Sequence, residues 1–156
     1  MARVDKPTIL VDTREPKRID GELSALGLTV ERVKLDTGDY LWVSRFGAPV
    51  VVERKTMADL LSSISGKQSN GSSRAQNQLA RLRQFPHPVL LVDGYPDVSA
   101  NGKILRGRTE TTWLQGGVDN WLLTVQSSGI RVAYAASGHL ATRLEYLVGY
   151  YEKKER

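Results

Sequence analysis

The chain has 156 residues, of which 22 are Lys or Arg and 17 are Asp or Glu, so its formal net charge is +5. This length fits one domain with one core, and a content of 40% hydrophobic and 25% charged residues excludes a disordered or collagen-like chain. The absence of cysteine excludes disulfide scaffolds, thiolate zinc sites, iron–sulfur clusters and cysteine nucleophiles. No apolar stretch has the length of a membrane span or the form of a secretory signal. We therefore expect a soluble intracellular protein, in the cytoplasm, nucleoid or nucleus, without membrane association.

The hydrophobic pattern predicts strands and helices in alternation. A buried strand over residues 8–12 precedes a short helix within residues 21–28. Three strands with alternating or continuous apolar residues follow, over residues 30–35, 39–44 and 49–55. Glycines between these strands supply turns, so we expect an antiparallel meander.

The helical period appears after residue 55, where Thr56 can cap a helix. Residues 65–73 are rich in Gly, Ser and Asn and predict a flexible loop. Beyond this loop we expect a helix over 74–85, a strand over 89–92, a hairpin turn at Asn101–Gly102, a helix over 111–126, a strand over 130–135 and a closing helix capped by Ser137. The order predicts a single α/β domain over residues 1–156, with a mixed central sheet flanked by helices.

Carboxylates and an amine gather on two neighbouring strands. Glu53 and Lys55 are two residues apart in a strand, so their side chains share a face, while Arg54 points to the other side. Asp39 faces Glu53 if the hairpin register is symmetrical about residue 46. Two such carboxylates repel each other unless a cation lies between them, and oxygen ligands favour Mg²⁺ or Mn²⁺. Beside that ion, Lys55 could orient a water molecule or stabilise charge on a phosphate.

Alternating charges on a hairpin also occur on solvated faces that have no catalytic role. Here the apolar run Val50–Val51–Val52 directly precedes the charged residues, which favours a buried strand that leads into a site. The spacing of the charges alone leaves both interpretations open.

Three segments extend the pattern: VDTRE at residues 11–15, TGDY at 37–40 and VERKTMADL at 52–60. Together they resemble the nuclease domain of the XPF family of structure-specific endonucleases (ERCC4-type), part of the PD-(D/E)xK superfamily, whose motif is GD followed by ERKxxxD. The basic segment 74–82, the strand at 89–92 and the segment 131–147 are similar to later parts of the family domain. The resemblance implies a restriction-endonuclease-like fold and a metal-dependent DNA endonuclease that acts on branched, flap or fork DNA.

The resemblance also implies a role for each matching residue. The catalytic set would be Lys55, Asp39, Glu53 and Arg54, and Arg54 would brace the site or contact phosphate. The metal ligands for Mg²⁺ or Mn²⁺ would be Asp39, Glu53 and Asp12. Supporting residues would be Glu15, Arg14 and Asp59. A local ion pair is an alternative for Glu15 and Arg14, and helix capping is an alternative for Asp59.

Basic residues near the motif are the candidates for contacts with DNA phosphates. They are Lys67, Arg74, Arg81, Arg83, Arg106 and Arg108. Arg74 and Arg81 share one face of a helix, although a basic helix face is often only solvated. Family members usually carry a helix-hairpin-helix module and some carry a helicase domain, and this sequence has neither. We therefore expect a homodimer or a partner protein to supply additional grip on DNA.

Two further hypotheses remain beside the endonuclease. The first is a non-catalytic DNA-binding or dimerisation subunit that supports a partner nuclease. Subunits of that kind normally have gaps in the motif, and this chain has none. The second is a sequence-specific nuclease of the restriction type, since the superfamily includes such enzymes.

Overall fold

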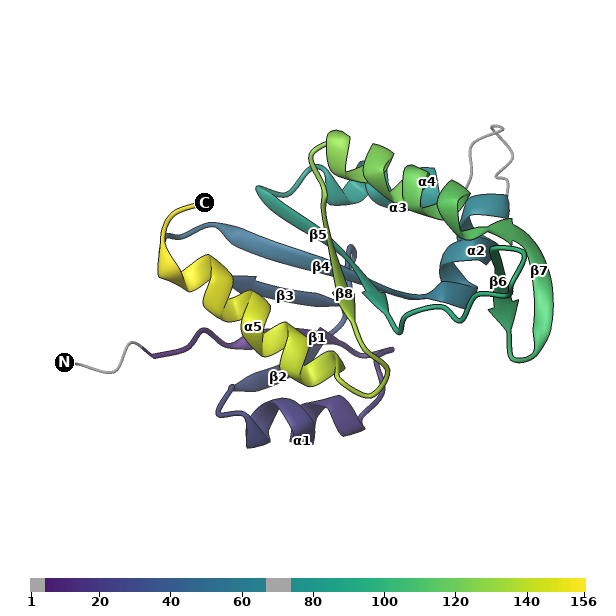
Figure 1. Ribbon diagram of the computed structural model, residues 1–156. Helices are drawn as coiled ribbons and strands as arrows, with labels where there is room; N and C mark the ends of the chain where they lie inside the picture. Colours follow the sequence, from purple (N-terminus) through teal and green to yellow (C-terminus); the bar gives the residue numbers. More distant parts are fainter. Residues whose placement is uncertain (1–4, 67–73) are drawn as a thin grey trace.

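The computed structural model describes residues 5–66 and 74–156, and these form a twisted sheet with helices on both faces (Figure 1). In chain order the elements are β1 (Ile9–Asp12), α1 (Arg18–Ala25), β2 (Val30–Val33), β3 (Tyr40–Val43), β4 (Pro49–Thr56), α2 (Met57–Ser65), α3 (Arg74–Leu82), β5 (His87–Asp93), β6 (Lys103–Arg106), β7 (Thr109–Leu114), α4 (Gln115–Ser127), β8 (Arg131–Ala135) and α5 (Leu140–Lys153). Among these described residues, no helix is both long and apolar enough to cross a membrane.

The main sheet has the strand order β2-β1-β3-β4-β5-β8. β3 is antiparallel to both of its neighbours, whereas the pairs β1–β2, β4–β5 and β5–β8 are parallel. The central strands read as continuous apolar runs, such as the fully buried Val50–Val51–Val52, because helices cover both faces. The expected mixed sheet flanked by helices is confirmed.

Two hydrophobic clusters lie on opposite faces of this sheet. On one face, α1 and α5 pack over the inner strands and bury Leu23, Trp42 and Leu144. On the other face, α2, α3 and α4 bury Leu60 and Leu122 with their neighbours. The motif strand β4 lies between the two clusters, so its backbone is held from both sides.

The predicted meander is half wrong. β2 does not pair with β3; it lies beside β1 in parallel, with Asp12 opposite Val33, and α1 makes the crossover connection. Parallel pairing joins strands that are distant in sequence, and local turn residues carry no signal for it. The β3–β4 hairpin is confirmed, since Tyr40 pairs with Val52 and the same register places Asp39 opposite Glu53.

The expected helix over 111–126 begins later, at Gln115. Residues 109–114 form β7, which pairs with β6 and is rich in threonine, a residue that favours strands. The chain does turn at Asn101–Gly102, where Val98 and Ile104 form an isolated antiparallel bridge. The β6–β7 hairpin itself turns at residues 107–108, because Arg106 pairs with Thr109.

Other boundaries also differ from the predictions. Ser137 does not cap the closing helix: a turn through Gly138, with φ of +78°, precedes His139, which is the N-cap of α5. The first helix is Arg18–Ala25 instead of lying within 21–28, and α3 ends at Leu82 instead of residue 85. Thr56 does cap α2, since its hydroxyl accepts from the Asp59 N–H at 3.2 Å. The predicted flexible loop lies mostly at 67–73, outside the described residues, and Ser65 is the last residue of α2.

Candidate active site

A polar pocket of about 290 Å³ lies where β4 passes the turn before β3. Its walls come from the loop after β1, the turn before β3, β4, α2 and α3. The lining residues are Arg14, Glu15, Asp36, Thr37, Gly38, Asp39, Glu53, Arg54, Lys55, Asp59, Gln78 and Arg81. The structure therefore brings together the whole predicted catalytic set and the supporting residues Arg14, Glu15 and Asp59.

The backbone before β3 is shaped by Gly38. Its φ of +82° lies in the left-handed region, and a Cβ at this position would collide with the Val51 side chain and approach the Val52 carbonyl. The close approach lets the Asp39 N–H donate to the Val52 carbonyl at 2.7 Å. In turn, the Arg54 N–H donates to Asp39 Oδ2 at 2.8 Å. Two backbone contacts thus fix the Asp39 carboxylate beside the motif strand.

Glu53 and Lys55 share one face of β4, as the spacing predicted, with 3.6 Å between Glu53 Oε1 and Lys55 Nζ. Both side chains are well buried, at 13% and 15% exposure. Burial raises the pKa of Glu53, and Lys55 opposes this rise. Burial and the neighbouring Glu53 raise the pKa of Asp39 to about 7. Two carboxyl groups with raised pKa values, side by side, form a site that gains from a cation.

Replacement of Asp39 by asparagine is expected to flatten the pH dependence of stability. The raised pKa of Asp39 means that the native protein holds a proton which the unfolded chain, with its ordinary carboxyl pKa of 3.8, has already released. The free energy of unfolding of the unmodified protein should therefore fall as pH rises from 3.8 towards about 7. Urea denaturation across this range, without divalent ions, measures the slope for both proteins. An unchanged slope in Asp39→Asn would contradict the assignment.

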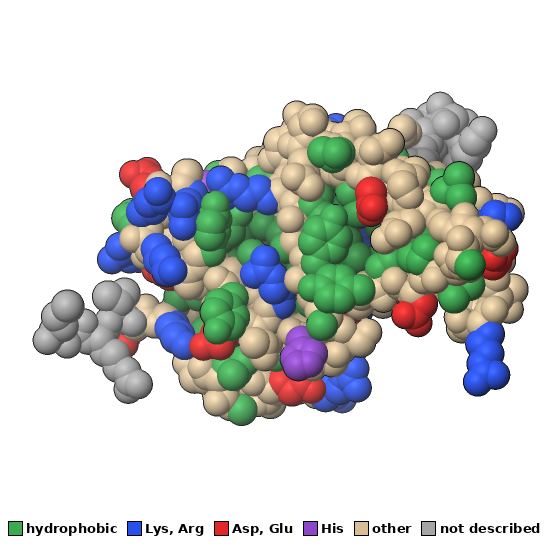
Figure 2. All heavy atoms as spheres, viewed as in Figure 1, with side chains coloured by type: hydrophobic (Ala, Val, Ile, Leu, Met, Phe, Trp, Pro, Cys, Tyr) green, Lys and Arg blue, Asp and Glu red, His purple; other side chains and the backbone are tan. Residues whose placement is uncertain are grey.

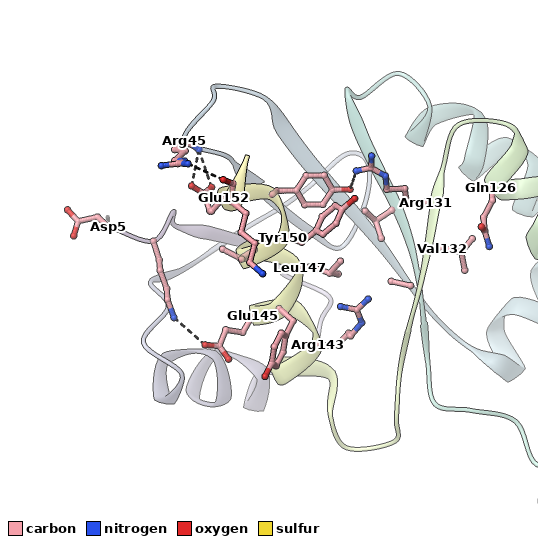
Figure 3. A pocket seen from close by; sticks show the side chains of 18 residues that line it. Asp5, Arg45, Gln126, Arg131, Val132, Arg143, Glu145, Leu147, Tyr150 and Glu152 are labelled. Carbon is pink, nitrogen blue, oxygen red and sulfur yellow. Dashed lines mark hydrogen bonds and ion pairs between the residues drawn. The ribbon is translucent and has the colours of Figure 1, made fainter. Parts of the chain in front are cut away.

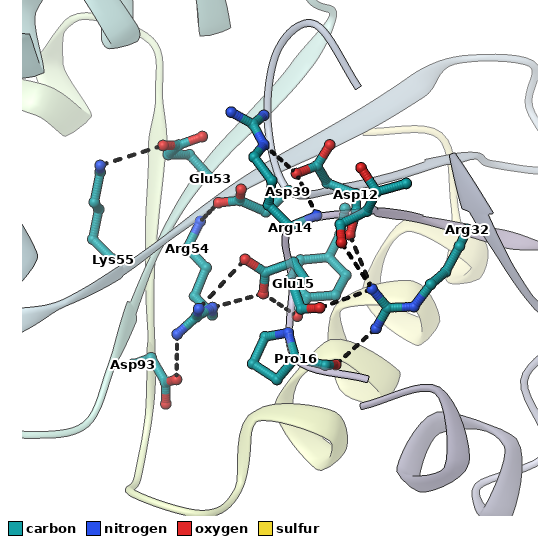
Figure 4. Close-up of polar contacts among 12 residues, drawn as sticks. Asp12, Arg14, Glu15, Pro16, Arg32, Asp39, Glu53, Arg54, Lys55 and Asp93 are labelled. Carbon is teal, nitrogen blue, oxygen red and sulfur yellow. Dashed lines mark hydrogen bonds and ion pairs between the residues drawn. The ribbon is translucent and has the colours of Figure 1, made fainter. Parts of the chain in front are cut away.

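Arg54 projects away from Glu53 and Lys55 and joins a buried network (Figure 4). Its Nε donates to Glu15 Oε2 at 2.8 Å, and its Nη1 donates to Asp93 Oδ2 at 3.2 Å. Glu15 is only 7% exposed and also accepts from the Tyr40 hydroxyl at 2.6 Å. Burial and this carboxylate raise the pKa of Tyr40. These contacts favour bracing of the site, one of the two roles expected for Arg54.

The loop that carries Glu15 is fixed by Arg32 on β2. The guanidinium donates to the carbonyl oxygens of Glu15 at 2.8 Å and Pro16 at 2.7 Å (Figure 4). It also forms an ion pair with Asp20 at 2.6 Å. No sequence pattern predicts these Arg32 contacts, because they depend on the parallel pairing of β1 with β2. Tyr40 and Asp93 were also missed, although Asp93 ends a buried strand at the same sheet edge.

Asp12 is fully buried and is not among the residues that line the pocket. Its Oδ2 accepts from Arg14 Nε at 2.7 Å, and its Oδ1 accepts from the Leu35 N–H at 2.9 Å. Burial alone would raise the pKa of Asp12, but these hydrogen bonds lower it overall. The Asp12 N–H donates to the Asp39 carbonyl at 2.9 Å. The geometry favours a bracing role for Asp12 over the metal-ligand role expected from the sequence.

The predicted DNA-binding residues occupy different parts of the surface. Arg81 on α3 lines the acid pocket, and Arg74 at the start of α3 donates to the hydroxyls of Ser62 and Ser63. Arg83 follows α3 and is exposed. The exposed Arg106 and Arg108 lie on the β6–β7 hairpin, which projects beside α2 (Figure 1). Lys67 lies outside the described residues.

A further pocket, of about 950 Å³, lies between α5 and β8 and contains neither Asp39 nor Glu53 (Figure 3). Figure 2 shows hydrophobic side chains over this face, with Lys and Arg side chains beside them. Tyr146 and Tyr150 of α5 are exposed, and the Arg131 guanidinium lies 5.3 Å from the Tyr150 ring centre. This aromatic and basic surface is separate from the acid pocket, and the two share no lining residue.

Comparisons with known proteins agree with this geometry. Two solved structures, of XPF from Aeropyrum pernix and of the same protein in complex with DNA, match with TM-scores of 0.64 and 0.63. Each is 25% identical to this chain, and the match covers 92% of this chain but 62% of the other. The search of curated proteins found no match to this sequence. The family model described as the ERCC4 domain matches residues 11–139, a span that includes the acid pocket and most of the sheet, so the chain belongs to the ERCC4 domain family.

Proposed function

We propose that the chain is a metal-dependent DNA endonuclease that hydrolyses phosphodiester bonds, with a preference for branched, flap or fork DNA. The observation that carries the proposal is the juxtaposition of Asp39, Glu53 and Lys55 in one pocket, with Arg81 at its wall. Membership of the ERCC4 domain family and the likeness to XPF, which has been solved with DNA, support it. Preference for branched DNA comes from the family resemblance.

The donors in the pocket suit Mg²⁺ or Mn²⁺. Within residues 5–66 and 74–156, no three His, Asp or Glu side chains group as a complete ligand set. Mg²⁺ usually retains several water molecules and takes one or two carboxylates together with substrate phosphates. Asp39 and Glu53 meet that requirement. Burial raises the pKa of both carboxyl groups, and the neighbouring Glu53 raises the pKa of Asp39 further. These two carboxylates would hold the ion, and Asp12 would brace the backbone behind them.

The side chains of the pocket have different roles in the proposed hydrolysis. A divalent ion bound by Asp39 and Glu53 would supply Lewis acidity toward the scissile phosphate and the attacking water. Lys55 places a positive charge beside Glu53, where it stabilises the charge that develops on the phosphate. Arg54 and Glu15 keep the motif strand and the loop after β1 in register. Arg81 and the basic hairpin would hold the DNA backbone through phosphate contacts.

A cleavage assay with flap, fork and linear duplex DNA tests the proposal. The purified chain with Mg²⁺ or Mn²⁺ should cut flap or fork DNA, and removal of the metal with EDTA should stop cleavage. Asp39→Asn and Glu53→Gln should lose cleavage, because each removes a ligand charge at nearly constant size. Asp119→Asn, a change at an exposed carboxylate on α4, is the matched control and should keep full activity.

Two results would replace the proposal by another function. Salt-dependent DNA binding without metal-dependent cutting of any substrate would indicate a non-catalytic subunit. Cutting of linear DNA at one preferred sequence would indicate a nuclease of the restriction type.

The proposal includes a second copy of the chain or a partner protein that adds grip on DNA. The pocket between α5 and β8, with the exposed Tyr146 and Tyr150 beside it, is the candidate surface for that contact. Exposed aromatic side chains beside arginine are typical of protein interfaces.

A further inference from the structure

Gln78 lies on α3 at the wall of the acid pocket, and the chemistry described above does not use it. Its amide oxygen Oε1 is buried and, among the described residues, has no hydrogen-bond partner. Buried polar atoms in folded proteins are almost always paired, and an exception calls for an explanation at that position. Because Gln78 lines the acid pocket, we look for the hydrogen-bond donor to its Oε1 among the residues of that pocket.

A second, much smaller cavity lies directly behind the pocket. Its volume of about 10 Å³ is roughly the space of one water molecule. Apolar side chains of α2, α3, α4 and β5 form most of its wall. Three residues line both the cavity and the acid pocket, and they are Glu53, Lys55 and Gln78. Gln78 therefore stands at the boundary between the charged pair and the apolar interior.

The chemistry of the Gln78 amide oxygen limits which groups can be its hydrogen-bond donor. Oε1 only accepts hydrogen bonds, and an ionised Glu53 has no hydrogen to donate. The Lys55 ammonium has three N–H donors, and Glu53 Oε1 at 3.6 Å engages no more than part of this capacity. Since the Lys55 side chain is only 15% exposed, its charge gains from an acceptor on the protein side. Ser63 and Trp121 can also donate, but they line the cavity and not the acid pocket.

We propose that Gln78 is a positioning residue for Lys55. Its Oε1 accepts a hydrogen bond from one water molecule in the small cavity, and that water accepts in turn from the Lys55 ammonium. The Gln78 amide and Glu53 together hold the Lys55 ammonium at the wall of the pocket, so that the Lys55 side chain does not turn towards solvent. The consequence for cleavage rests on the proposed nuclease function, whereas the hydrogen bond itself does not. Fixed orientation of a catalytic charge is worth more than the charge alone.

Gln78→Met removes the acceptor and keeps the length of the side chain. In the unmodified protein, NMR relaxation of the Lys55 Cε–Hε group should give an order parameter well above that of the exposed Lys17. In Gln78→Met this value should fall towards that of Lys17, and the single-turnover cleavage rate at saturating DNA should fall about 10–100-fold. The DNA Kd and the Tm should remain unchanged. Gln84→Met makes the same chemical change at an exposed position just after α3 and should alter none of these values.

Gln78→Glu provides the rescue. A carboxylate keeps a hydrogen-bond acceptor at this position, so Lys55 should stay ordered in this variant. If the Gln78 side chain only filled space, Gln78→Met would leave Lys55 as ordered as Gln78→Glu does. Equal order of Lys55 in the unmodified protein and in Gln78→Met would overturn the proposal, even if cleavage fell. The proposal would also be overturned if Ser63→Ala reproduced every effect of Gln78→Met. The Gln78 amide oxygen would then accept its hydrogen bond from the Ser63 hydroxyl and not from the group that holds Lys55. An unmodified chain without cleavage would count against the nuclease function, and the order of Lys55 would still decide the role of Gln78.

Discussion

Replacement of Lys55 by methionine is expected to lower the single-turnover rate of metal-dependent DNA cleavage by about 10²–10⁴-fold, the range for loss of a positioned catalytic group. Two effects act in the same direction. The pocket loses the positive charge that faces the phosphate, and Glu53 loses the neighbour 3.6 Å away that restrains the rise of its pKa. A less ionised Glu53 would also bind a divalent ion more weakly. Rates at several Mg²⁺ concentrations separate the two effects, because excess metal restores only the second.

Lys17→Met is the control for the loss of one positive charge. Lys17 is exposed and precedes α1, on the opposite side of the sheet from α2 and α3. Its replacement should weaken the attraction to DNA only through net charge and leave the rate at saturating DNA unchanged. Equal loss of rate in the Lys17 and Lys55 variants would show that Lys55 acts through general electrostatic attraction, against a specific role in the pocket.

The parts of the fold that follow from local patterns were predictable. The β3–β4 hairpin register followed from turn residues and from the symmetry of positions 39 and 53 about residue 46, and it is confirmed by the pairing of Tyr40 with Val52. The parallel pairing of β2 with β1 was not predictable, because the two strands are joined through α1 and no turn residue marks their register. The strand β7 was mistaken for helix because Trp113 and Leu114 suit either period.

The same division holds for the site. Glu53 and Lys55 share a strand face, which a period of two dictates, and the structure places them together. Asp93 reaches Arg54 only because β5 lies parallel to β4, with Thr56 opposite Asp93. Gln78 reaches the pocket from a helix beyond the segment 67–73, and nothing in the spacing of α3 distinguishes it from Gln76. Local periodicity therefore finds the candidate catalytic pair Glu53 and Lys55, whereas the contacts that support this pair depend on tertiary packing.

Replacement of Arg54 by methionine is expected to lower the free energy of unfolding by about 3–5 kcal/mol, the cost of removing one partner of a buried ion pair. The guanidinium is the partner of two carboxylates, with 2.8 Å to Glu15 and 3.2 Å to Asp93. Glu15, with its side chain only 6% exposed, would retain the Tyr40 hydroxyl but lose the compensating charge. The buried carboxylate must then stay ionised without a cation or take up a proton. Urea denaturation at neutral pH measures the loss.

The double variant Arg54→Met with Glu15→Gln separates the unpaired charge from the lost packing. A neutral amide at position 15 removes the isolated charge, so the double variant should be more stable than Arg54→Met alone. Arg18→Met, at an exposed arginine in α1, should change the free energy of unfolding by no more than about 0.5 kcal/mol. If Arg54→Met cost as little as Arg18→Met, the network would not brace the fold, and Arg54 would instead be free to contact DNA phosphate. A large loss, partly recovered in the double variant, would mean that the middle residue of the ERK motif holds the loop after β1 against the sheet.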